Sequence, residues 1–292
     1  MANAIALFRQ YIGNVLDEVY KAASLTSKLD GASELVQQGA NANELIIPKM
    51  SMSGLADYSR NGGYVNGDVT LTNETVQCNF DRGRMFQVDN MDNIETAGVA
   101  FGRLAGEFIR TKVVPELDAF RFASYAGVSG ISTVAAAALS TGADVIAALA
   151  AASDGMDNDE VPAEDRHLFI TPALLGLVRD LDTTKSKEIL AAFSSITKVP
   201  QSRFYTAISQ LDGTTSGEEA GGYTKAANAK NINFMIIHKP AVIQFEKHVA
   251  PKVITPEANQ DADAWKFGYR NVGIADAYEN KVAGIYLHKS NV

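Results

Sequence analysis

The sequence predicts an α+β protein that combines extended strands, one long amphipathic helix and an inserted α/β lobe. Trp265, Phe267 and Tyr269 stand at every second position, which is the period-two pattern of a strand with one buried face. Over residues 94–111 apolar side chains recur at three- and four-residue steps, as on one face of a helix. Residues 129–248 alternate strand-like and helix-like segments. Together these patterns predict a mixed fold with more than one structural region.

The composition is that of a folded protein, with 46% hydrophobic and 21% charged residues among 292. This length suits one large domain or two smaller ones. No stretch of about eighteen apolar residues is present, and the first residues lack the basic start of a signal peptide. Cys78 is the only cysteine, so no disulfide forms within the chain and a reducing compartment is expected. We therefore expect synthesis in the cytoplasm and no membrane partner.

The balance of charge argues against a dedicated nucleic-acid-binding protein. The net charge is −8, from 34 acidic and 26 basic residues. Affinity for nucleic acid comes mainly from basic groups that displace counterions from phosphates. Sequence-specific binding to DNA is therefore not expected.

The first 43 residues predict a helix followed by an arm. Apolar residues recur at helical spacing from Ile5 to Tyr20, which gives an amphipathic helix whose apolar stripe needs a partner. Residues 24–43 are rich in Ala, Ser, Gly and Gln without periodicity. They predict an extended or mobile arm.

A long hairpin is expected next. Glu44–Met50 and Val69–Phe80 have the pattern of strands, and glycine and asparagine punctuate the connection between them. Two strands alone are marginally stable in water. This ribbon must therefore lie on something else to stay ordered.

The long helix is expected to begin at Asp92, whose spacing to Glu95 suits a capping box, and to end near Tyr125. A helix of that length is roughly 50 Å long at 1.5 Å per residue. Pro115 should bend it, because the proline ring removes a backbone donor and crowds the carbonyl four residues earlier.

The lobe, residues 129–248, is predicted from alternating elements. The expected strands are His167–Ile170, Arg203–Ile208 and Ile232–Ile237. The expected helices are an Ala-rich one that begins at Thr141 or Asp144 and ends near Ser153, and one that begins with the cap and first-turn pair Thr171 and Pro172. Residues 213–230 are expected to form a mobile loop, because they are rich in Gly, Thr and Ala.

A second hairpin is expected near the end of the sequence. Val272–Ala277 and Val282–Leu287 are rich in β-branched residues, and the turn-compatible residues 278–281 separate them.

Two blocks carry a resemblance to a known family. The blocks are F-G-R-L-A-G-E-F-I-R at Phe101–Arg110 and the strand-rich stretch Ala264–Leu287. With them, the order of segments from Glu44 to Lys289 resembles the major capsid proteins of tailed bacteriophages, which have the HK97-like fold. The resemblance implies five regions: an N-terminal helix and arm over 1–43, an extended β-hairpin loop over 44–90, the spine helix of the peripheral domain over 91–128, an axial domain over 129–248, and return strands of the peripheral domain over 249–292.

The resemblance implies a structural role as a major head protein. Copies of the chain would form pentamers and hexamers in an icosahedral shell around packaged double-stranded DNA, with the ribbon lying across a neighbouring subunit. The implied partners are the chain itself, scaffolding and portal proteins, a decoration protein and, without sequence specificity, the DNA. The implied location is the virion capsid, assembled in the host bacterial cytoplasm.

Three alternatives remain open at this point. An encapsulin-like bacterial nanocompartment shares the fold but encloses enzymes. A tail-tube protein is disfavoured by the long helix. An enzyme would need clustered acid, base or nucleophile residues.

No catalytic, cofactor-binding or metal residue is predicted. Residues 154–160 are rich in carboxylates but miss the order of an EF-hand loop, so a solvated turn is the preferred interpretation over an ion site. The histidines have no zinc-binding spacing; they are His167, His238, His248 and His288. Ser129, Ser216 and Cys78 lack the context of an activated nucleophile. Gly102 and Gly106 lie inside the predicted helix, where small residues permit close packing rather than nucleotide binding.

Contacts between subunits are expected to be non-covalent. Some members of the resembled family join subunits through an isopeptide bond from a loop lysine, but no lysine occurs here between Met50 and Thr111. Ion pairs are the other candidates, with at most about 1 kcal/mol for each exposed pair. The candidate residues are Arg60, Arg82, Arg84 and Arg103 with Asp57, Asp81, Asp89 and Asp92.

Overall fold

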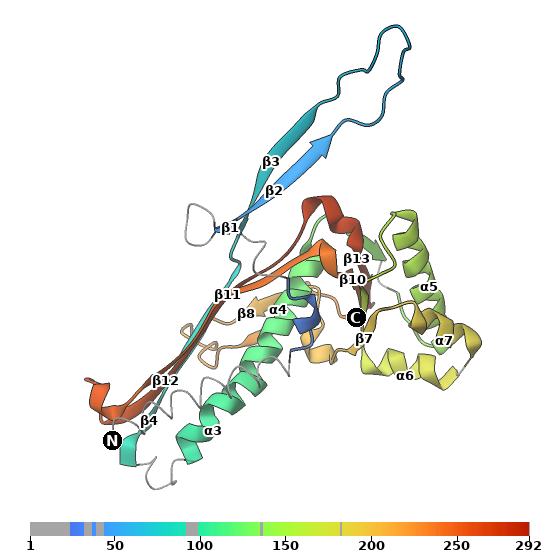
Figure 1. Ribbon diagram of the computed structural model, residues 1–292. Coiled ribbons are helices and arrows are strands. Elements are labelled where there is room, and N and C mark those ends of the chain that lie inside the picture. Colours follow the sequence, from blue (N-terminus) through green and yellow to red (C-terminus); the bar gives the residue numbers. More distant parts are fainter. Residues whose placement is uncertain are drawn as a thin grey trace.

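The computed structural model describes residues 24–31, 37–38, 44–91, 99–134, 137–181 and 183–291. Figure 1 shows a long helix beside an elongated sheet, a ribbon that projects from one end of that sheet, and a lobe with helices of its own. The helix expected over residues 5–20 and the helix start expected at Asp92 and Glu95 lie outside the described residues.

Thirteen strands make up the sheets of the described residues, in four groups. The strands are β1 Gln37–Gln38, β2 Glu44–Met52, β3 Val69–Gln77, β4 Phe80–Asp89, β5 Ser132–Val134, β6 Arg166–Ile170, β7 Ser195–Lys198, β8 Ile208–Gln210, β9 Tyr223–Lys225, β10 Ile232–His238, β11 Val242–Ile254, β12 Ala264–Ala277 and β13 Ile285–Lys289. The sheet orders are β1-β2-β3, β5-β13-β10-β6-β7, β11-β12-β4 and β8-β9.

The helical elements comprise α-helices and shorter turns. The α-helices are α3 Val99–Phe108, α4 Val114–Gly127, α5 Gly142–Asn158, α6 Pro172–Leu181 and α7 Thr184–Ala191. Shorter turns are η1 Ser27–Leu29, the π-helical η3 Ile109–Val113, η4 Gln201–Arg203, η5 Lys239–Ala241, η6 Pro256–Ala258 and η7 Glu279–Gly284.

The ribbon, defined as residues 44–77, forms the expected antiparallel pair of β2 and β3. The prediction of one strand over Val69–Phe80 is wrong, because the chain changes sheets at Cys78 and Asn79. The Asn79 side chain bonds both backbone groups of Ala275, donating to its carbonyl oxygen at 2.8 Å and accepting from its N–H at 3.1 Å. From Phe80 onward β4 pairs with β12, so residues 80–89 of the expected 44–90 hairpin belong to the elongated sheet.

The long helix packs on the elongated sheet, β11-β12-β4, through an apolar face. Ala105, Ile109 and Leu117 are buried against Phe267 and Tyr269. This packing confirms the buried aromatic face predicted for residues 265–269. It also explains why the alternating pattern was so regular, since every second residue of β12 faces the same helix.

The helix changes its hydrogen-bonding pattern just before Pro115. Residues Ile109–Val113 form a π-helical turn, and Pro115 lies in the first turn of α4, where no helical donor is needed. The wider turn removes the clash that the proline ring has with the carbonyl of Thr111 in a regular α-helix. Pro115 was predicted to bend the helix, and the structure shows a change of helix type before it, with the helix running on to Gly127.

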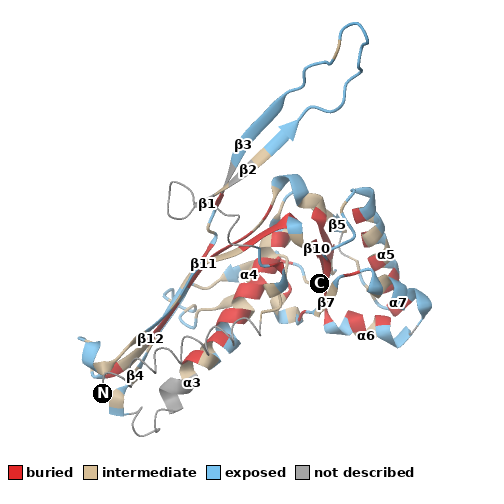
Figure 2. Cartoon of the chain, in the orientation of Figure 1, coloured by how far each residue is buried: buried red, intermediate tan, exposed pale blue. Residues whose placement is uncertain are grey.

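The lobe has a central five-stranded sheet between two apolar layers. On one side of the sheet lie α5, α6 and α7, whose core includes Leu149, Met156 and Val178. On the other side lies α4, where Phe122 contacts both Phe169 and Phe204 edge to face. Figure 2 shows buried residues concentrated where α4 and the sheet meet.

The hairpin expected over Val272–Leu287 is wrong. β13 lies inside the lobe sheet, antiparallel to β10 and parallel to β5, whereas β12 pairs with β11 and β4. The short η7 carries the chain from one sheet to the other. Its last residue, Gly284, is pressed against Ala241, and a Cβ there would lie 2.5 Å from the Ala241 Cβ. Local β-propensity was correct, but only tertiary packing selects the partner strand.

Most other predictions for the lobe are confirmed. Thr141 caps α5 in a capping box with Asp144, Pro172 is the first residue of α6, and β6 and β10 match their expected strands within one residue. The helix α5 ends at Asn158, five residues later than expected. The prediction of a strand over Arg203–Ile208 is wrong. Arg203 donates a hydrogen bond to Asp118 of the long helix, and only Ile208–Gln210 forms a strand.

We expect Gly142→Ala to destabilise the lobe by about 1 to 3 kcal/mol, because overpacking forces backbone shifts. A Cβ at Gly142 would lie 2.3 Å from the Leu177 carbonyl oxygen and 2.7 Å from a Leu181 methyl group, so α6 must move away from α5. Urea unfolding measures the change. Gly176→Ala on α6 is the matched control, since a Cβ there meets nothing within 4 Å and stability should not fall.

Candidate functional site

The ribbon carries most of the exposed apolar surface of the described residues. Eight of the twelve large apolar side chains found exposed there lie between residues 50 and 71. These eight are Met50, Met52, Leu55, Tyr58, Tyr64, Val65, Val69 and Leu71. Figure 2 shows the projecting part of the ribbon almost wholly exposed. An apolar patch of this size on a folded subunit marks a surface for another molecule.

The ribbon is tied to the body at its base and not at its tip. Lys49 Nζ lies 2.5 Å from Glu279 Oε2, which joins β2 to η7. At the far end, residues 53–68 form a tip held by its own contacts, such as the Ser59 and Gly63 bridge and the rings of Tyr58 and Tyr64 at 4.9 Å. The tip therefore has local shape without support from the body of its own subunit.

Residues 24–31, here called the anchor, are held against the long helix by two buried residues and a set of hydrogen bonds. This corrects the expectation of an extended or mobile arm for that part of the chain. Leu29 and Thr26 are buried, and the carboxylate of Asp118 on α4 accepts hydrogen bonds from the Ser24 and Thr26 hydroxyls and from the Leu25 and Thr26 N–H groups. A fully buried carboxylate with this many donors fixes the anchor to the long helix.

Asp118 also joins the anchor to other elements. Arg203 of η4 donates to Asp118 Oδ2 at 3.2 Å, so the lobe and the helix meet at the same carboxylate. One turn along α4, the buried Arg121 donates to the Thr26 hydroxyl and to Glu246 of β11. The anchor, long helix, lobe and elongated sheet thus share one buried polar network.

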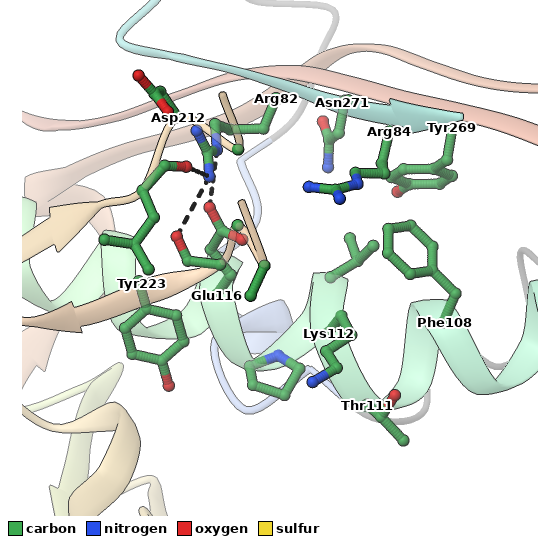
Figure 3. Close-up of a pocket in the computed structure, with 18 of the residues that line it drawn as sticks. Arg82, Arg84, Phe108, Thr111, Lys112, Glu116, Asp212, Tyr223, Tyr269 and Asn271 are labelled. Carbon is green, nitrogen blue, oxygen red and sulfur yellow. Dashed lines mark hydrogen bonds and ion pairs between the residues drawn. The ribbon is translucent and has the colours of Figure 1, made fainter. Parts of the chain in front are cut away.

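Beside the long helix lies an open cleft of about 1090 Å³. Its walls are β4, the helix from Leu104 to Glu116, and the β8-β9 hairpin with its loop. Figure 3 shows Phe108 on the helix facing Tyr269 and Arg84 on the sheet, with Lys112 on the same helix as Phe108. The cleft lining therefore combines aromatic rings with charged groups of both signs, and the charged residues are Arg82, Arg84, Lys112, Lys225, Glu107, Glu116 and Asp212.

Two arginines of β4 hold the loop that forms one wall of this cleft. Arg82 donates to Glu116 Oε1 at 2.8 Å and to the carbonyl oxygens of Leu211 at 2.7 Å and Gly222 at 3.2 Å, as Figure 3 shows. Arg84 donates to the Glu219 carbonyl oxygen at 2.9 Å. These bonds join β4, the long helix and the β8-β9 loop at one edge of the cleft.

Two glycines of the loop make room for Arg84. Gly213 and Gly221 have φ values of +78° and +66°, and a Cβ on either would lie within 3 Å of Arg84 Nη1. The loop also bonds itself, since the Asp212 carboxylate accepts from the N–H groups of Thr214 and Thr215. The Thr215 hydroxyl, which also donates to this carboxylate, and then the two N–H groups lower the pKa of Asp212 well below its ordinary value. Residues 213–230 were expected to form a mobile loop, but the structure shows a hydrogen-bonded hairpin there that includes β9.

The ion pairs differ from those expected between arginines 60, 82, 84 and 103 and aspartates 57, 81, 89 and 92. Arg82 pairs with Glu116, and Asp81 pairs with Arg270 at 2.6 Å, which lowers the pKa of Asp81. Asp89 accepts from the Met91 N–H. The partners of Arg82 and Asp81 lie far away in the sequence, so the spacing of charges alone did not reveal these ion pairs.

We expect Arg82→Ala to destabilise the protein by about 2 to 3 kcal/mol, because it leaves a largely buried carboxylate without its charged donor. Burial raises the pKa of Glu116, and Arg82 opposes that rise. A raised pKa means that the folded protein binds the proton more tightly than the unfolded chain, so this contribution to stability is lost as pH rises through the raised value. Without Arg82 the pKa of Glu116 rises further.

The destabilisation by Arg82→Ala should therefore be larger near about pH 8 than near about pH 5, as measured by urea unfolding at both values. Arg60→Ala on the exposed ribbon tip is the control and should change stability little at either pH. Equal losses at the two pH values would contradict the assigned role of Glu116.

The other candidate groups are engaged in structural contacts. In residues 154–160, Asp157 pairs with the buried Arg166 at 2.6 Å, and Asp159 accepts from the Ser132 hydroxyl. His167 bonds Ser195 at 2.7 Å, and burial lowers the pKa of His167, His238 and His288. No group of three His, Cys, Asp or Glu side chains suited to a metal ion is found within the described ranges. The helices in those ranges include none long and apolar enough to span a membrane.

Solved structures share this architecture. No model of a known protein family and no curated protein matches the chain. A structure from Gordonia phage Cozz matches with a TM-score of 0.59 and 11% identity over 92% of this chain and 87% of that one. The capsid structure of the cyanophage P-SCSP1u gives 0.54 and 13% over 87% and 85%, and a virus-like particle from Pyrococcus furiosus gives 0.57 and 10% over 96% and 99%. The chain therefore has the HK97-like fold of phage capsid proteins.

Proposed function

We propose that the chain is the major capsid protein of a tailed bacteriophage, and that many copies assemble into an icosahedral shell around double-stranded DNA. The observation that supports this most is the ribbon, which exposes a large apolar surface in a subunit whose other regions have well-packed cores. Another copy of the chain covers that surface in the shell. The shared capsid fold supports the same function.

The regions of the subunit have distinct roles in this proposal. The long helix from α3 to α4 is the spine, and the elongated sheet beside it forms the peripheral domain. The lobe is the axial domain, whose copies meet around five- and six-fold axes. Its boundaries follow residues 129–248 with one change, since β13 completes the lobe sheet from the end of the sequence.

The proposed partners follow from a shell that is filled with DNA. They are the chain itself, scaffolding and portal proteins, a decoration protein, and the packaged DNA without sequence specificity. The helix predicted over residues 5–20 is the proposed contact for scaffolding. The role is structural rather than enzymatic, assembly takes place in the host cytoplasm, and the mature protein resides in the virion.

A bacterial compartment that encloses enzymes remains the second candidate. The structural likeness to the virus-like particle from Pyrococcus furiosus, which covers 99% of that protein's chain, supports this second candidate. The genes beside this one distinguish the two functions, because a terminase and a portal accompany a phage head and a cargo enzyme accompanies a compartment.

Negative-stain electron microscopy of the purified protein tests the proposal. We expect closed shells of uniform diameter, alone or with the scaffolding protein supplied. A protein that stays monomeric under both conditions, at concentrations where it is folded, contradicts a shell function of either kind.

A further inference from the structure

We propose that the Asn66-Gly67 pair of the ribbon tip is a site of spontaneous deamidation, at which Asn66 loses ammonia and becomes aspartate or isoaspartate without any enzyme. Asn-Gly occurs twice in the sequence, as Asn61-Gly62 and Asn66-Gly67, and both pairs lie in the tip, residues 53–68. All four residues are exposed and lie outside the regular strands. The two pairs differ in how their backbone is held, and this difference selects Asn66.

The reaction needs only water and the atoms of the pair. The backbone nitrogen of Gly67 gives up its proton and attacks the side-chain amide carbon of Asn66, which forms a C–N bond. The bond from that carbon to the amide nitrogen breaks, and this nitrogen takes up a proton and leaves as ammonia. Water then opens the five-membered imide ring at either carbonyl carbon, which gives aspartate or isoaspartate. Glycine favours ring closure, because the lack of a Cβ leaves its nitrogen accessible and its backbone easy to rotate.

The turn around Asn61 protects the first pair. The Gly62 N–H donates to Ser59 Oγ at 3.1 Å. Ser59 and Gly63 exchange backbone hydrogen bonds of 3.2 and 2.8 Å across the same turn. The bond to Ser59 Oγ keeps the proton on the Gly62 nitrogen, and the closed turn resists the rotation that brings this nitrogen to the side chain. Ring closure at Asn61 is therefore slow.

The second pair lies on a less restrained stretch of backbone. Its nearest restraint is Asp68, whose N–H donates to Ser53 Oγ at 3.0 Å and whose carbonyl oxygen accepts from the Ser53 N–H at 3.0 Å. Within the part of the chain that the structure describes, Asn66 and Gly67 themselves make no hydrogen bond. The Gly67 nitrogen keeps its proton less firmly than that of Gly62, and its backbone rotates more easily.

Deamidation adds a charge to an apolar tip. Tyr64 and Val65 next to the site are 87% and 66% exposed, and burial of a new carboxylate beside them costs free energy unless a cation pairs with it. Isoaspartate also lengthens the main chain by one carbon. If the proposed shell function holds, copies that stay unassembled lose the ability to join a shell as they age.

Mass spectrometry of the dispersed full-length subunit tests the site. After incubation in mildly alkaline buffer, trypsin releases residues 61–82 as one peptide that contains both pairs. Fragment ions assign the gain of about 1 Da to one asparagine or the other. We expect Asn66 to react at least about tenfold faster than Asn61. Equal rates, or a faster reaction at Asn61, overturn the proposal.

Two substitutions test the physical cause. Ser59→Ala removes the acceptor of the Gly62 N–H and should raise the rate at Asn61 at least about fivefold, with the rate at Asn66 unchanged. Gly67→Ala should suppress the reaction at Asn66, because a methyl group hinders the attacking nitrogen. The new Cβ lies 3.4 Å from the Ser53 Cβ, which is ordinary contact, so the tip keeps its shape. An unchanged rate at Asn61 in Ser59→Ala overturns the assigned cause of the selectivity.

Electron microscopy of two further variants separates this site from the shell function. Asn66→Asp carries the product charge and should lower the yield of shells at least about fivefold, whereas the neutral Asn66→Ser should assemble as the unmodified chain does. Equal yields from both variants overturn the effect on assembly and leave the shell function standing. Deamidation at Asn66 in a chain that forms no shells supports the site and contradicts the shell function.

Discussion

Shortening the ribbon is expected to abolish assembly while leaving the folding of the subunit unchanged. Met52 and Val69 pair directly across β2 and β3, so an Asn-Gly turn can join them in place of residues 53–68. The bridge and the ring contact of the tip join its own residues, so its removal should not lower the stability of the rest of the subunit. The shell loses the surface that joins neighbours, and the yield of particles should fall at least about tenfold.

Sedimentation and electron microscopy measure the loss of particles, and thermal unfolding of the dispersed subunit checks the fold. A second variant keeps the length of the tip and replaces Leu55, Tyr58, Tyr64 and Val65 by Ser. It should fail to assemble for the same reason. If the shortened chain forms shells at the wild-type yield, the ribbon is not what holds the shell together.

Replacing Asp118 by Ala should cause the largest loss of subunit stability, about 3 to 5 kcal/mol, because it leaves Arg203 and several anchor donors without their buried partner. Asp118 is fully buried at the point where the anchor, the long helix and the lobe meet. The loss should release residues 24–31 from the body. Urea unfolding measures the first effect and limited proteolysis near Ser24 measures the second.

Asp180→Ala on the exposed end of α6 is the control for the same change of side chain and should alter stability by less than about 0.5 kcal/mol. Asp118→Asn separates charge from hydrogen bonding, because an amide still accepts from the Thr26 N–H. A small effect of Asp118→Ala, with the anchor still protected from protease, would mean that apolar packing around Leu29 holds the anchor.

The sequence predicted those elements whose causes are local. The helix start at Thr141, one of the two positions expected, the proline start of α6 and the alternation at residues 265–269 each depend on neighbours a few residues away, and each is confirmed. The effect of Pro115 on the helix also has a local cause, and it takes the form of a π-helical turn just before the proline.

The errors have non-local causes. The strand over Val69–Phe80 is divided because Asn79 bonds Ala275, almost two hundred residues later. Before β13 the chain turns at Gly284, which packs closely against Ala241, more than forty residues earlier in the sequence. Arg82 forms its ion pair with Glu116 of the long helix. The cleft was missed altogether, since its walls come from three separate regions. The alternation of Arg82, Arg84 and Phe86 was the one signal in the sequence that pointed to it.

The interior place of β13 sets an order of events during synthesis. Residues 285–289 are made after every other strand of the lobe, yet they lie inside its sheet, between β5 and β10. Until residue 289 has been made, β10 has one unpaired edge and β5 has no partner strand in that sheet. An unfinished chain therefore lacks a complete lobe sheet.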